Sequence, residues 1–97
     1  MIFAELRYPD RYEDFHDELL AFVRTRFADI ESGLQGDSWI WITDGGEKVA
    51  LDTFSSMKHQ VKSPKPGPHV KKVIDALKEK YEITIYGAPE LEAHEDD

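Results

Sequence analysis

The chain has 97 residues, of which 40% are hydrophobic and 33% charged, and a formal net charge of −8. This length suits a single domain with one hydrophobic core, and the absence of cysteine excludes disulfides, thiol nucleophiles and cysteine-bound metals. The negative charge argues against nucleic-acid binding, because a phosphate-binding surface needs cations. With no long apolar run and no secretory signal pattern, we expect a cytoplasmic protein with no membrane span.

The first two expected elements are a strand and a long helix. Residues 1–8 alternate between apolar and polar side chains, as in a strand with one buried face. Asp10, followed three residues later by Glu13, resembles a capping box at the start of a helix. Apolar residues then recur at helical spacing, which predicts a helix over 11–31 that ends at Gly33.

Residues 38–54 predict a β-hairpin that is apolar on both faces. Strands over 38–43 and 48–54 flank Gly45-Gly46, and two glycines accept the positive φ of a tight turn. The predicted cross-strand pairs are Ile42 with Val49, Ile40 with Leu51, Trp41 with Ala50, and Trp39 with Asp52. The isoleucines then share the core side of the sheet, and the two indoles lie on the opposite side.

The rest of the chain predicts one loop, one helix and one strand. Residues 55–67 lack a clear period, although part of this segment can extend the preceding strand or form a bulge. Apolar spacing predicts a helix over 68–81, and alternation predicts a last strand over 83–86. The acidic tail, residues 88–97, offers little apolar surface and is expected to be disordered.

The predicted order of strand, helix, strand, strand, helix and strand resembles the ferredoxin-like split βαβ arrangement. The resemblance implies an α+β domain over residues 1–87, with the order βαββαβ, a four-stranded antiparallel sheet and both helices on one face. It is a resemblance of topology alone. Because that arrangement hosts many unrelated functions, it implies little about activity.

Aromatic side chains are concentrated on the sheet face that the two helices would leave uncovered. They are Phe3, Trp39, Trp41, Phe54 and Tyr86. An exposed apolar patch of this kind usually marks an interaction site. Three explanations stay open: the 55–67 loop or the tail covers the face, a second copy of the chain binds it, or a different partner does. Single-stranded nucleic acid is the least favoured partner, because few cations flank the aromatic residues.

A basic segment precedes and opens the second predicted helix. Residues 53–74 contain five lysines and no acidic residue, which leaves 7 basic and 20 acidic residues in the rest of the chain. Because a helix N-terminus favours anions, the segment is a candidate site for an anion or an acidic partner. Its candidate residues are Lys58, His59, Lys62, Lys65, His69, Lys71 and Lys72. The alternative is a solvated basic loop balanced by acidic residues of the first helix or the tail.

No pattern in the sequence points to a reaction, a metal or a cofactor. The four histidines lack metal-ligand spacing, and His16 is expected on the helix surface. Ser55 and Ser56 lie near His59 and Asp52 in the sequence, but a nucleophile and its base are defined by geometry rather than spacing. We therefore expect a non-catalytic protein without metal or cofactor, acting as a homodimer or with an unknown protein partner through the sheet face that carries these five aromatic side chains. The alternative is an enzyme or a domain that binds a small anionic ligand at the lysine-rich loop.

Overall fold

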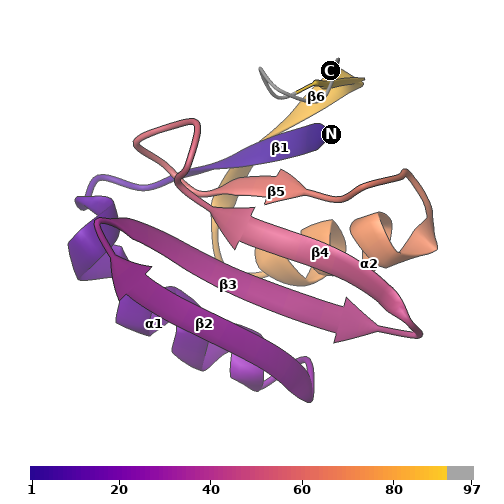
Figure 1. The fold of residues 1–97 in the computed structure, drawn as a ribbon. Helices are drawn as coiled ribbons and strands as arrows, with labels where there is room; N and C mark the ends of the chain where they lie inside the picture. Colours follow the sequence, from indigo (N-terminus) through magenta and orange to yellow (C-terminus); the bar gives the residue numbers. More distant parts are fainter. Residues whose placement is uncertain (92–97) are drawn as a thin grey trace.

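The computed structural model describes residues 1–91. Its elements are β1 (Ile2–Arg7), α1 (Tyr12–Arg24), β2 (Asp29–Gln35), β3 (Asp37–Asp44), β4 (Glu47–Asp52), β5 (Gln60–Lys62), α2 (Pro68–Lys78) and β6 (Glu82–Glu90). The strands form one sheet in the order β2-β3-β4-β5-β1-β6, and each neighbouring pair is antiparallel. Both helices pack on one face: in Figure 1, α1 lies behind β2 and β3, and α2 lies behind β4 and β5. In the part of the chain that the structure describes, no helix is long and apolar enough to cross a membrane.

The predicted α+β fold with two helices is confirmed, but the ferredoxin-like arrangement is not, because the sheet has six strands rather than four. The two further strands are β2 and β5. They arise from segments that the sequence pattern predicts as the end of the first helix and as part of the long loop.

The segment that becomes β2 leaves the helix because it pairs along β3 instead. Helix α1 ends at Arg24, and the hydroxyl of the following Thr25 donates to the carbonyl of Phe22 at 2.6 Å. Ile30 then lies opposite Ile42 in the β2–β3 register. Its spacing from the preceding apolar residues fits a helix as well as a strand, so the predicted helix over 11–31 is too long at its C-terminal end.

Strand β5 is short, but it joins the two halves of the sheet. Val61 is fully buried and lies opposite Leu51 of β4 on one side and Ala4 of β1 on the other. The chain between β4 and α2 therefore forms a separate strand and does not merely lengthen β4. This inserted strand keeps β4 and β1 from pairing directly.

The last strand is longer than its alternation predicts. β6 runs from Glu82 to Glu90, past the Gly87–Pro89 segment where the sequence pattern ends it, and Ile2 lies opposite Glu90. β6 therefore includes the first three residues of the predicted tail. Residues 92–97 lie outside the described part of the chain.

The predicted register of the β3–β4 hairpin is confirmed at each of its four predicted pairs. Gly45 and Gly46 both have positive φ, 60° and 82°, which allows the tight turn between the strands. Ile40, Ile42, Val49 and Leu51 are fully buried against the helices. Since side chains alternate along a strand, Trp39 and Trp41 must lie on the face that carries no helix.

Candidate interaction face

The two indoles of β3 form a pair on the helix-free face of the sheet. Their ring centroids are 4.4 Å apart, and both side chains are half-buried. Trp39 lies over Gly33 of the neighbouring strand β2, where an added Cβ atom would collide with the indole ring. Gly33 therefore makes room for the Trp39 ring and does not end a helix. We call Gly33, Trp39, Trp41, Lys48 and Ala50 the aromatic face.

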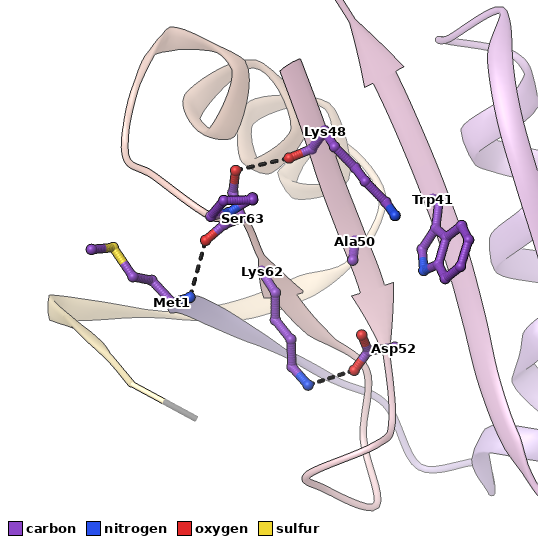
Figure 2. Close-up of a pocket in the computed structure, with 8 residues that line it drawn as sticks. Met1, Trp41, Lys48, Ala50, Asp52, Lys62 and Ser63 are labelled. Carbon is purple, nitrogen blue, oxygen red and sulfur yellow. Dashed lines mark hydrogen bonds and ion pairs between the residues drawn. The ribbon is translucent and has the colours of Figure 1, made fainter. Parts of the chain in front are cut away.

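Trp41 is held between a cation and a small residue of β4. The Lys48 ammonium lies 3.6 Å from the centroid of the Trp41 ring, a cation–π contact. Ala50 lies directly opposite Trp41 in the register, and its short side chain leaves space beside the indole. Figure 2 shows the Trp41 ring and the Lys48 side chain side by side on the neighbouring strands.

A cavity of about 270 Å³ lies beside Trp41 on this face. It is lined by Met1, Trp41, Lys48, Ala50, Asp52, Lys62, Ser63 and Pro64. The ammonium of Lys62 lies 2.6 Å from a carboxylate oxygen of Asp52, and each of these side chains is only 5% exposed (Figure 2). Removing one partner of such a buried pair is costly, because the other charge stays in a poorly solvated place.

The other predicted aromatic residues lie away from the indole pair. Phe54, in the loop after β4, is 53% exposed. Tyr86 is half-buried on β6, and three strands separate it from β3; burial raises the pKa of its hydroxyl. Phe3 is only 9% exposed and belongs to the core cluster. The register of β1 shifts between Ile2 and Ala4, and such a bulge turns Phe3 to the helix side, where it borders α2.

The lysines of the predicted anion site are paired with groups of the same chain. Lys62 pairs with Asp52, Lys65 with Glu47, Lys71 with Asp75 and Lys72 with Asp44, while Lys58 donates to the carbonyls of Tyr8 and Asp10. A cavity of about 420 Å³ at the start of α2 contains acidic as well as basic side chains. Within residues 1–91, the acids that balance these lysines lie at the end of β3, at both ends of β4 and in α2, rather than in the first helix.

Both histidines of that segment are buried, and both are hydrogen-bonded. His69 Nε2 lies 3.0 Å from the Ser63 hydroxyl and 3.1 Å from the carbonyl of Lys65. His59 is fully buried and contacts a different group of residues, so the two imidazoles have separate partners. Among residues 1–91, no group of three or more His, Cys, Asp or Glu side chains is arranged to hold a metal ion.

His59 belongs to a chain of four buried or half-buried polar side chains. Tyr8 Oη lies 2.8 Å from His59 Nδ1, and His59 Nε2 lies 2.6 Å from Ser38 Oγ. Ser38 Oγ in turn lies 2.5 Å from Nδ1 of His16. We call these residues the polar network. It joins the end of β1, the first turns of α1, the start of β3 and the segment before β5.

The donors and acceptors of the polar network fit two neutral imidazoles. The Tyr8 hydroxyl accepts from the backbone N–H of His59 at 3.1 Å, and burial raises its pKa to about 12, so it keeps a proton to donate to Nδ1. His59 Nε2–H can then donate to Ser38, and the serine proton to His16. Burial lowers the pKa of His59 to about 4, and burial also lowers the pKa of His16.

This network holds the fold together and does not form an accessible nucleophile site. Ser38 is fully buried, so its hydroxyl cannot meet a substrate in this structure. The residues that suggest a nucleophile and its base in the sequence are also separated: Ser56 donates to Glu5, and Asp52 pairs with Lys62. His16, expected at the helix surface, is only 5% exposed. The sequence pattern misses this network because its four residues come from four distant segments.

Comparison of the chain with protein-family models, with curated proteins and with solved structures finds no match.

Proposed function

We propose that the protein acts by associating with another protein through the aromatic face. The observation that carries this proposal is the pair of half-buried indoles on the sheet face that carries no helix. Tryptophan is the residue type most enriched among the anchors of protein interfaces, because it buries a large area with few rotatable bonds. Trp39 and Trp41 also contact each other, so little side-chain freedom is left to lose on binding.

The surroundings of the indoles support the same use. The packing of Trp39 on Gly33 and the contact of Trp41 with Lys48 fix both rings in place before a partner arrives. The adjoining cavity of about 270 Å³ can accept a side chain of the partner. Lys48 is exposed at its rim, where a cation affects association rate and selectivity more than affinity.

The tryptophan fluorescence of the protein, excited at a wavelength that tyrosine hardly absorbs, reports on this face alone, because the chain's two tryptophans both lie there. Binding at the face should shift the emission to shorter wavelength and protect it from acrylamide quenching. An immobilised copy of the protein first captures a partner from an extract of the cells that express it. The measurement then compares the emission of the free protein with that of the protein bound to this partner. A complex in which quenching is unchanged would place the partner elsewhere and contradict the proposal.

Trp41→Ala is the matching substitution. We expect it to weaken binding about 30-fold or more, as for an interface anchor worth about 2 kcal/mol. Met57→Ala is the control, because Met57 is 72% exposed in the β4–β5 loop and is not part of the aromatic face. Circular dichroism checks that both variants fold. Equal binding by the two folded variants would refute the proposal, and unfolding of Trp41→Ala alone would assign Trp41 to the core.

A further inference from the structure

Strand β2 is an open edge of the sheet. It pairs only with β3 within the described residues, so the outward-pointing N–H and C=O groups of alternate residues along this seven-residue strand have no neighbouring strand. An edge of this kind is a template for a further strand. Proteins usually block such edges with lysine or proline, and β2 contains neither. The opposite edge strand, β6, contains Pro89.

We propose that β2 pairs antiparallel with β2 of a second copy of the chain, with Ser32 opposite Ser32. In this register each of the seven residues of one β2 strand lies opposite a residue of the other β2 strand. The pairs are Asp29 with Gln35, Ile30 with Leu34, Glu31 with Gly33, and Ser32 with itself. Both acidic residues then face uncharged residues, and Leu34, which is 41% exposed in the single chain, lies against Ile30.

Neighbouring registers are less favourable. Centring the pair on Glu31 sets two carboxylates directly opposite each other, which is destabilising. Centring it on Gly33 shortens the overlap to five residues and leaves Ile30 without a partner. The two acids and the two apolar residues of β2 therefore select the same register.

The proposed register also keeps the two copies facing the same way. It pairs odd-numbered residues with odd-numbered residues, so both sets of helices lie on one side of a continuous sheet. Gly33, under Trp39, then faces Glu31 of the second copy, which pairs with Trp41 there. Two aromatic faces become one surface. The inference rests on β2 and does not depend on what binds the aromatic face.

Sedimentation velocity over about 1–500 μM tests the pairing. The wild-type protein should show a concentration-dependent dimer. Gln35→Glu should weaken it about fivefold, because each dimer then contains two repulsions between Asp29 and the carboxylate introduced at position 35. Asp29→Lys combined with Gln35→Glu should restore wild-type affinity. Within one copy these positions are six residues apart along the strand, roughly 20 Å, so the rescue cannot arise inside a single chain.

Each other outcome overturns the proposal. A monomer at every concentration rejects it, as does a dimer that Gln35→Glu leaves unchanged. A dimer that is lost in Trp41→Ala but not in Gln35→Glu shows that the copies meet through the aromatic face, which supports the proposed function and rejects the β2 interface. Thermal unfolding of each variant controls for the nearby Asp37, which lies opposite Gln35 in the hairpin.

Discussion

Acid should destabilise the protein through His59, and the size of the effect follows from its burial. Burial lowers the pKa of His59 from the ordinary 6.5 to about 4 in the folded state. As the pH falls from 7 towards 4, the unfolded chain therefore takes up a proton at this side chain that the folded chain does not. The folded state loses stability in this window, by about 2 kcal/mol at pH 5 and about 3 kcal/mol at pH 4.

The groups that the structure places against the His59 imidazole do not stabilise its protonated form, so they do not offset this loss of stability. The side chains that lie against His59 are the hydroxyls of Tyr8 and Ser38, the ring of Phe15, and His16, whose positive charge would itself oppose protonation. Well below pH 4 both states carry the proton, and His59 contributes no further change. Its effect is therefore a step confined to the range between the two pKa values.

Urea unfolding at half-unit steps from pH 7.5 to 4.5 measures this step. The matched variant is His59→Gln, which keeps a neutral hydrogen-bonding side chain but has no proton to gain. The carboxylates titrate in both proteins, so the difference in unfolding free energy between wild type and variant isolates His59. This difference should shrink by about 2 kcal/mol between pH 7 and pH 5. A difference that stays constant would show that His59 is protonated or solvated in the folded protein, and the polar network would be wrong.

Two further substitutions test the aromatic face and the cavity beside it. Gly33→Ala should destabilise the protein by about 1–3 kcal/mol and shift its fluorescence, because the added methyl group displaces the Trp39 ring. Gly87→Ala is the control, since open space surrounds that position. Equal melting temperatures for the two variants would contradict the close packing of Trp39 on Gly33. Lys62→Met should cost about 3–5 kcal/mol, measured by urea unfolding, because it removes the cation 2.6 Å from buried Asp52. A double-mutant cycle with Asp52→Asn should show strong coupling between the two positions, and additive losses would mean that the pair contributes little.

The parts of the fold that local pattern determines are predicted well from the sequence. The register of the β3–β4 hairpin follows from its alternation and from Gly45-Gly46, because a two-residue turn leaves only one pairing. The start of α2 at Pro68 follows in the same way, since proline suits the first helical turn. In both cases the signal lies in neighbouring residues and needs no information about the rest of the chain.

The two strands that the sequence pattern misses depend on distant partners. β2 is recognised only once β3 is beside it, because Ile30 and Leu34 are four residues apart and fit a helix as well as a strand. β5 has three residues, too few for a period, and its place is set by β4 on one side and β1 on the other. The same reason applies to the polar network, whose residues are brought together only by the completed sheet.

The candidate site divides along a single strand. Ser38 and Trp39 are neighbours on β3, yet alternation sends the serine to the helix side and the indole to the opposite side. The serine is buried between two histidines and ties β3 to α1 and to the segment before β5, which fixes the strand that carries the indoles. Exposure of the indoles therefore cannot be explained by a loosely held strand. A firmly anchored strand that presents two tryptophans on the helix-free face of the sheet is what an interface anchor requires, and this supports the proposal that the protein binds a partner through that face.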